Sequence, residues 1–473
     1  MEDRILGSRR NRQSARQSTY ARHRPTRRLP LIAWVPLLFC LATVILRPAS
    51  SLSARYAEEH DFLLDPDDDQ QITAAISNRT RPPHLARSFT ARDYSALAPT
   101  SPVIRLIPNL TDPAPSIDFR QSSSFLSKIL IPRVPDTHNN TLVQQIIADI
   151  FEHELKPKPS SPHGPARSGW TLERQTFESN TPEGKRKFTN LIATKERDAP
   201  RKLMLAAHFD SKFFAKGTRE EGFIGATDSA APCAILVDVV RAVDSLLDRR
   251  TEARKKKGES IAAETTLQLV FFDGEEAFHA WTHSDSIYGA RALASNWTEP
   301  ILPLLPPTRR SADDGEESVD LEPRRLTPPA YTPVKPVDTI EHMVLLDLLG
   351  APDPAIPNYF GHTSWLYDHL VDAERKLRSA DILIWPTEAD KKKSFFTNRQ
   401  AWGGIEDDHL PFAEAGVPIF HLIPSPFPPV WHRITDDASA LDYPTMYAWA
   451  MLMRLFTIEY LDLSPFVAEG SKA

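Results

Sequence analysis

Residues 267–276 read LQLVFFDGEE, an apolar run of six residues that ends directly in a group of acidic residues. Three other short apolar runs share this character: LMLAA at 203–207, MVLLDL at 343–348 and VPIFHLI at 417–423. Runs of this length are typical of strands that are buried on both faces. Helical patterns alternate with them, at 142–154, 235–247, 363–378 and 445–461. The sequence therefore predicts an α/β fold, with a mixed, largely parallel central sheet flanked by helices.

Acids and imidazoles follow the predicted strands where each strand ends. They are His208, Asp210, Asp228, Glu275, Glu276, Asp347, Asp407 and His432. Because sites in such sheets form at the carboxyl ends of the strands, we expect these side chains to gather. Burying unpaired carboxylates is costly, so the cluster needs a cation or a shared proton. Zinc binds His nitrogen and Asp or Glu oxygen, and a catalytic zinc site keeps one position open.

Polar residues near the strand ends can also have a purely structural explanation. Asp210 could cap a helix or orient a turn, and His421, between two apolar neighbours, could be a core histidine. The adjacent acids Glu275 and Glu276 fit such roles least well, because two neighbouring carboxylates repel each other unless a metal or a proton intervenes.

Composition limits the other classes of protein. The chain has 473 residues, a formal net charge of −6 and only two cysteines, Cys40 and Cys233. The net charge argues against a general nucleic-acid binder, and two cysteines exclude a disulfide scaffold and a cysteine-based zinc site. Proline is frequent, with 42 residues, and nine of them fall within 299–338. We interpret that segment as a proline-rich insertion or long loop.

The N-terminal region predicts a membrane anchor. Residues 29–46 carry no charge and span about 27 Å as a helix, close to the thickness of a bilayer. Residues 1–28 contain nine arginines, so the positive-inside rule predicts a cytosolic tail and a single-pass type II protein. A stem at 47–95 and a catalytic domain at 96–468 would then lie in the lumen of the Golgi or endoplasmic reticulum. The alternative is a cleaved signal peptide and a secreted protein.

Four sequons for N-glycosylation agree with a secretory route. They are Asn78, Asn109, Asn139 and Asn296, all on the predicted luminal side.

Several segments resemble the glutaminyl-peptide cyclotransferases, or glutaminyl cyclases, which have the fold of the zinc aminopeptidases of peptidase family M28. The segments are HFDSK at 208–212, GATDSA at 225–230, FFDGEEAF at 271–278, LLDLLGAPDP at 345–354, EDDHLPF at 406–412 and HLIPSPFPPVWH at 421–432. The match extends over about 115–465, and its last two segments are the most specific. The resemblance implies an enzyme that converts the N-terminal glutamine of peptides or proteins to pyroglutamate and releases ammonia.

The resemblance also implies residue roles. One zinc ion per subunit would be bound by Asp228, Glu276 and His432. Glu275 would be the general acid and base, and Asp347 and Asp407 would form a hydrogen-bonded pair near the substrate. The pocket for the glutamine side chain would be lined by Trp281, Ile405, Phe427 and Trp431.

The chain departs from the family in three places. Many secreted relatives have a disulfide at the positions that are Ala207 and Cys233 here, so that bridge cannot form. Glu406 stands where relatives often have glutamine, which changes the charge at the entrance of the pocket. The insertion at 299–338 is unusual and could crowd the site.

Two other functions use the same residues. A two-zinc aminopeptidase would bind a second ion with His208 and Asp347, with Asp228 as the bridging ligand and Asp210 in support. Glu275 would then activate water. An inactive, membrane-anchored binding protein is the other alternative, but such a chain would be expected to lose its metal ligands or its base, and all are present. The two tryptophans and the IPSPFP segment suit a small closed pocket, which favours the cyclase.

Overall fold

The computed structural model describes residues 96–157, 169–259, 265–300, 334–385, 387–401 and 404–470. All of them belong to one compact unit, 62–473. Its centre is a six-stranded sheet with the order β1-β2-β4-β3-β5-β8. The strands are β1 (Thr171–Thr181), β2 (Gly184–Thr194), β3 (Arg201–His208), β4 (Thr265–Phe272), β5 (Ile340–Leu346) and β8 (Ile419–Leu422). Strands β4, β3, β5 and β8 are parallel, which confirms the predicted α/β class and the four predicted strands.

The hairpin of β1 and β2 was not predicted. It joins the edge of the sheet at β4, and both of its pairings are antiparallel. Strand β1 is at best half-buried along its whole length, and its sequence TLERQTFESNT is mostly polar. An edge strand of this kind lacks the apolar run that revealed the four central strands.

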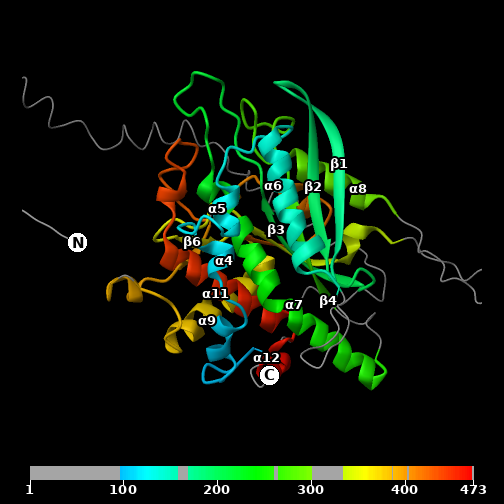
Figure 1. Ribbon diagram of the computed structural model, residues 1–473, viewed down its shortest axis with the longest axis vertical. Helices are drawn as coiled ribbons and strands as arrows, with labels where there is room; N and C mark the ends of the chain where they lie inside the picture. Colours follow the sequence, from blue (N-terminus) through cyan, green and yellow to red (C-terminus); the bar gives the residue numbers. More distant parts are fainter. Residues whose placement is uncertain are drawn as a thin grey trace, which may run out of the picture. The chain divides into compact units, whose positions relative to one another are not determined.

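Helices cover both faces of the sheet. Side chains of successive strand residues point to opposite faces, so Leu203 and Leu205 of β3 enter one core and Met204 and Ala206 enter the other. The first core is covered by α6 (His138–Asp149), α7 (Ala231–Lys257), α9 (Ser364–Ser379) and α11 (Tyr443–Tyr460). Figure 1 shows α7 and α11 side by side in this layer. The second core is covered by α8 (Tyr288–Thr298) and α10 (Leu410–Glu414).

The four predicted helices are confirmed, with longer bounds in most cases. The segment predicted at 142–154 is α6 followed by the π-helical turn η2 (Ile150–Glu154). From the sequence, the basic segment KKKG at 255–258 would be expected to form a surface loop, but helix α7 continues to Lys257, so that expectation is wrong. Its basic last turn complements the negative end of the helix dipole, and Gly258 ends it with a positive φ of 70°.

Shorter elements complete the fold. They are η1 (Ile104–Asn109), α4 (Ala114–Ile117), α5 (Phe125–Ile129), η3 (Ala226–Ala230), η5 (Pro336–Thr339), β6 (Ile356–Asn358), η6 (Gly361–Thr363), η7 (Asp390–Lys392), β7 (Phe396–Gln400), η8 (Ala438–Ala440) and α12 (Ser464–Gly470). Strands β6 and β7 form a separate parallel pair.

The predicted tail, anchor and stem, at 1–28, 29–46 and 47–95, lie outside the described residues. Within the described part of the chain, no helix is both long and apolar enough to cross a bilayer. Most of the insertion, 301–333, is likewise outside that part. Its last residues form η5, and Val337 is buried in the second core. The interpretation of the whole insertion as loop is therefore wrong at this end.

Candidate active site

The predicted site residues lie at the carboxyl ends of the parallel strands. Strand β3 ends in His208, β4 is followed by Glu275 and Glu276, and β5 is followed by Asp347. The turn after β4 depends on Gly274, which has a φ of 75°. A Cβ atom there would approach the Phe188 ring to 2.4 Å, so the turn that presents the two glutamates requires glycine.

Asp228, Glu276 and His432 form the group predicted to bind zinc. Their ligand atoms lie within 4.8 Å of one another. Nε2 of His432 is 3.4 Å from Oε2 of Glu276 and 3.6 Å from Oδ2 of Asp228. Asp228 is presented by η3, just before α7, and the chain reaches His432 after β8. Three separate segments thus bring a nitrogen and two carboxylates together, which is a ligand set that zinc accepts.

Two buried oxygens of this group support a cation site. Oδ2 of Asp228 and Oε1 of Glu276 have no hydrogen-bond partner among the described residues. Burial and the neighbouring Glu276 raise the pKa of Asp228 well above its ordinary value. Burial acts in the same direction on Glu276, but Lys212 and His432 outweigh it and lower the pKa of that carboxyl. A divalent cation would satisfy the free oxygens and remove the repulsion, so the residues fit a metal.

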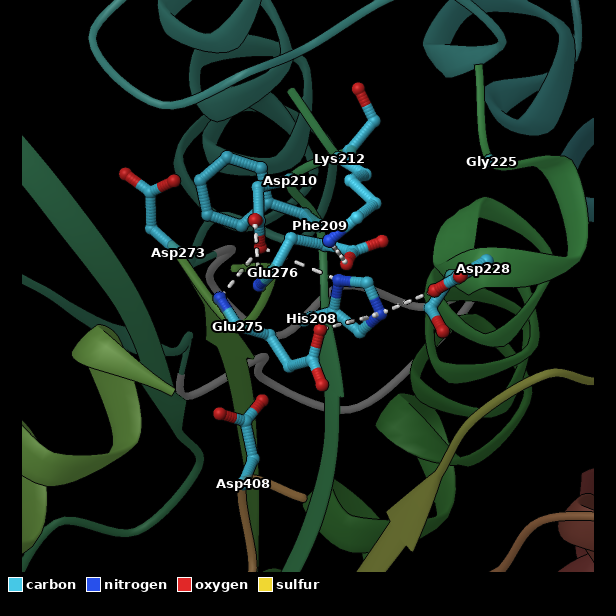
Figure 2. A network of polar contacts seen from close by, with 12 residues as sticks. His208, Phe209, Asp210, Lys212, Gly225, Asp228, Asp273, Glu275, Glu276 and Asp408 are labelled. Carbon is cyan, nitrogen blue, oxygen red and sulfur yellow. Dashed lines mark hydrogen bonds and ion pairs between the residues drawn. The ribbon is translucent and has the colours of Figure 1, made fainter. Parts of the chain in front are cut away.

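His208 links several carboxylates behind this group. Its Nε2 lies 3.0 Å from Oδ1 of Asp228, 3.4 Å from Oδ1 of Asp347 and 3.9 Å from Oε2 of Glu275. Figure 2 shows the imidazole between Asp228 and Glu275. Burial opposes a charge on His208, but Glu275 and the surrounding carboxylates raise its pKa well above the ordinary value.

The ligand atoms of His208, Asp228 and Asp347 also lie within 4.8 Å of one another. The predicted one-metal and two-metal ligand sets are thus both brought together. A third group with the same spacing, Asp407, His409 and His421, was not predicted as a ligand set.

Glu275 is the predicted general acid and base. It is buried, and burial together with Glu276 and Asp407 raises its pKa well above the ordinary value, although His208 opposes the shift. Asp210 fixes the backbone around it by accepting hydrogen bonds from the N–H groups of Glu275 (3.1 Å) and Glu276 (3.3 Å). Figure 2 shows Asp210 in this position. Asp210 therefore orients the turn rather than facing the pocket.

Asp347 and Asp407 lie in the same pocket, but their nearest polar partners are other residues. The hydroxyl of Ser229 donates a hydrogen bond to Oδ1 of Asp347. Nε2 of His421 lies 2.7 Å from Oδ2 of Asp407. Ser229 and His421 are thus contacts of the site that sequence reasoning missed. Their signal was weak, because each has an apolar residue on at least one side and a core role explains it equally well.

One pocket contains all ten residues assigned to catalysis, metal binding and the substrate wall. It is lined by Asp228, Glu275, Glu276, Trp281, Asp347, Leu348, Ile405, Glu406, Asp407, Ile423, Phe427, Trp431 and His432. Its volume is about 380 Å³, including the open entrance. The ring of Trp431 stacks on the imidazole of His432, with 3.9 Å between the ring centroids. Phe427 packs against Trp431 with 5.0 Å between the ring centroids.

Arg133 is a further residue that the sequence did not reveal. Its guanidinium is fully buried and donates hydrogen bonds to the carbonyls of Phe209, Ile224 and Gly225. A longer one, 3.4 Å, reaches the carbonyl of Asp228. Arg133 therefore joins the segment after β3 to the segment that presents the predicted zinc ligand.

Lys212 is another such residue. Its Nζ lies 3.4 Å from Oε2 of Glu276 and 2.8 Å from the carbonyl of Ala277. Figure 2 shows its chain reaching across to Glu276 from the loop after β3. A positive charge therefore lies next to Glu276, and Lys212 is not among the described residues that line the pocket.

Comparison with known proteins agrees with this geometry. Residues 190–457 match the model of peptidase family M28. The chain is 36% identical over 338 residues to a glutaminyl-peptide cyclotransferase of Bothrops jararaca, covering 72% of this chain and 80% of that protein. It is 36% identical over 334 residues to one of Bos taurus, covering 67% and 83%. The solved glutaminyl cyclase of Macrostomum lignano superposes with a TM-score of 0.59 at 30% identity, over 81% of this chain and 99% of that one. The chain therefore belongs to peptidase family M28 and, within it, to the glutaminyl-peptide cyclotransferases.

Proposed function

We propose that this protein is a glutaminyl-peptide cyclotransferase that uses one zinc ion, bound by Asp228, Glu276 and His432. The observation that carries the proposal is the position of Glu275. It is a buried carboxyl with a raised pKa, and it lines a small aromatic-walled pocket together with these three ligands. Family membership supports the same activity.

The reaction is an intramolecular acyl transfer. The α-amine of an N-terminal glutamine attacks its own γ-carboxamide carbon, a C–N bond forms in a five-membered lactam, and the amide nitrogen leaves as ammonia. Zinc, when bound, would act as a Lewis acid on the γ-carbonyl oxygen. Because the nucleophile is already tethered to the electrophile, the protein mainly has to hold the cyclising conformer.

Glu275 would move the proton. It would accept a proton from the attacking amine and deliver it to the leaving nitrogen. A raised pKa suits both steps, because a carboxyl that titrates closer to neutral pH takes up and returns a proton more evenly. Asp210 holds the backbone of Glu275, which fixes the carboxyl on its turn.

The aromatic walls would control water. Trp281, Phe427 and Trp431 surround the space next to Glu275. Excluding water matters because hydrolysis of the same carboxamide would give glutamate instead of the lactam. The size of the pocket suits one side chain better than a long segment of peptide.

A two-zinc aminopeptidase is the second candidate. It is favoured by one observation, the spacing of His208, Asp228 and Asp347, which would suit a second ion. In that enzyme Glu275 would activate water, and free glutamine would be released from the peptide.

The test uses the purified full-length protein with zinc and a neutral peptide that begins with glutamine, followed by mass spectrometry. We expect the intact peptide to lose one ammonia, and the Glu275→Gln variant to lose this activity while it retains zinc. Free glutamine together with two zinc ions per chain would establish the aminopeptidase. An unchanged peptide with zinc bound would refute both.

We also propose that residues 29–46 anchor the enzyme as a type II protein of the secretory pathway. The proposal rests on the uncharged run and on the arginine-rich segment before it. Extraction of membranes at alkaline pH should leave the protein in the membrane fraction, and protease should remove only the N-terminal tail from sealed vesicles. Release at alkaline pH would contradict the anchor.

A further inference from the structure

The pocket is strongly acidic, and one of its carboxylates differs from the rest. Of the described residues that line it, six are Asp or Glu, and His432 is the only one whose side chain can carry a positive charge. Asp228, Glu275, Glu276, Asp347 and Asp407 are all buried. Glu406 alone among the six is half-exposed, so it lies where the pocket opens to solvent.

Glu406 is held in place by a wall of the pocket. The indole Nε1 of Trp281 donates a hydrogen bond of 2.6 Å to its Oε2. The segment before Trp281 is fixed in turn, because Asp285 accepts hydrogen bonds from the backbone N–H groups of Phe278 (2.9 Å), His279 (2.9 Å) and Ala280 (3.1 Å). The Glu406 carboxylate therefore has a defined position at the entrance.

In the part of the chain that the structure describes, the cations near the site contact other carboxylates than that of Glu406. Lys212 contacts Glu276, and His432 lies between Asp228 and Glu276. His279, close to Trp281 in sequence, lies 2.7 Å from Glu183. Within the described part of the chain, the hydrogen-bond partner of Glu406 is a neutral indole. A fixed negative charge thus remains at the pocket entrance.

We propose that Glu406 is a specificity-determining residue that selects substrates by the charge of the residue following the N-terminal glutamine. The inference rests on the proposed cyclase function. When the glutamine side chain occupies the pocket, the next residue lies at the entrance, near Glu406. Lysine or arginine there is attracted by the carboxylate, and aspartate or glutamate is repelled.

The expected effect is moderate because the entrance is open to water. A charge about 7 Å from the carboxylate in a water-like dielectric changes kcat/KM about threefold in each direction, so basic and acidic peptides should differ by about five- to tenfold. At an ionic strength near 1 M, the Debye length falls to about 3 Å and the difference should largely disappear.

The test measures kcat/KM for three peptides, Gln-Lys-Ala, Gln-Ala-Ala and Gln-Glu-Ala, at low and high ionic strength. Glu406→Gln removes the charge but keeps an oxygen that can accept the Trp281 hydrogen bond. Trp281→Phe is the matched control, because it removes the hydrogen bond and keeps the charge. We expect the basic-to-acidic ratio to fall severalfold in the first variant at low salt, and to be largely retained in the second.

Three results would overturn the inference. The first is an unchanged ratio in folded Glu406→Gln at low salt. The second is a wild-type ratio near one at low salt, or a ratio that salt does not reduce, and this measurement needs no variant. The third is the absence of cyclisation of Gln-Ala-Ala by the wild type, which would overturn the proposed function and this inference with it. Normal cyclisation of all three peptides at equal rates would overturn the inference alone.

Discussion

Replacing Arg133 with lysine should weaken zinc binding, although its guanidinium contacts the backbone carbonyl of Asp228 and not the carboxylate that would bind the ion. The guanidinium reaches in two directions, to the carbonyl of Phe209 on one side and to those of Ile224 and Gly225 on the other. Lysine keeps the charge but carries its donors on one atom, so it can serve only one of the two segments.

The size of the effect follows from the carbonyls that lose their partner. About two buried carbonyls would be left unsatisfied, at about 1–3 kcal/mol each, so we expect the free energy of unfolding to fall by about 2–6 kcal/mol. Gly225 lies in the segment that leads to Asp228, which is the predicted zinc ligand. Supporting residues of this kind typically change metal affinity about 10- to 100-fold, and we expect a loss in that range.

Arg454 provides a matched control. It is also fully buried, and it donates two hydrogen bonds of 2.7 Å to Asp238, between α11 and α7. Arg454→Lys keeps the charge but loses the two-pronged contact and the hydrogen bonds to the carbonyls of Ile107 and Thr111, so it should lower stability by a comparable amount. It touches none of the predicted zinc ligands, so its zinc affinity should stay within about twofold of the wild type.

The assay is urea unfolding of the metal-free proteins, together with competition for zinc against a chelator of known affinity. The reasoning is refuted if Arg133→Lys unfolds more easily but binds zinc as tightly as the wild type. It is equally refuted if both variants lose the same affinity, because the effect would then reflect general loss of stability.

Three further predictions concern catalysis, pH dependence and the missing disulfide. Glu275→Gln should lower kcat by about 10²- to 10⁴-fold with zinc content unchanged, as measured by steady-state kinetics and metal analysis; a loss below tenfold would exclude a role as general base. Burial lowers the pKa of Lys202 to about 8, so the unfolded chain binds more protons between pH 8 and about 10.5 and wild-type stability should rise across that window. Lys202→Met lacks this titrating group, so its free energy of unfolding relative to that of the wild type should fall by up to about 3 kcal/mol across the same window, measured by urea unfolding. A difference that stays constant with pH would contradict the shift. Ala207→Cys should form a disulfide with Cys233 under oxidising conditions and raise the free energy of unfolding by about 2–4 kcal/mol; free thiols at both of these positions after oxidation would show that they do not face each other.

The parallel part of the sheet could be predicted because burial dictates its composition. Every residue of β4 is buried, and seven of the eight residues of β3 are. Strands covered on both faces must be apolar, so they stand out from the rest of the sequence. Strand β1 has no fully buried residue on either face, so its sequence contains no apolar run. Its pairing with β2 therefore could not be predicted from hydrophobicity.

The candidate site could be predicted only for residues whose type and position in the sequence indicate a catalytic or metal-binding role. Glu275 and Glu276 stand out as adjacent acids after a strand, and the rule that sites form at strand ends gathers His208 and Asp347 with them. Arg133 could not be found in this way. The carbonyls that it joins across the site are 76 to 95 residues away, and a carbonyl has no signature in the sequence.

Arg133, His208 and Lys212 together determine the distribution of charge around the pocket. Arg133, His208 and Lys212 lie behind the carboxylates, and each contacts a segment or side chain of the predicted zinc group. These three residues partly compensate the charge of the buried carboxylates. The pocket lining itself, which contains six carboxylates among the described residues, remains negative. A negative pocket attracts both a divalent cation and the α-ammonium group of a peptide. The amine attacks in its neutral form, and Glu275, with its pKa raised by burial and by the neighbouring carboxylates, is placed to accept the proton that the nitrogen releases as the C–N bond forms.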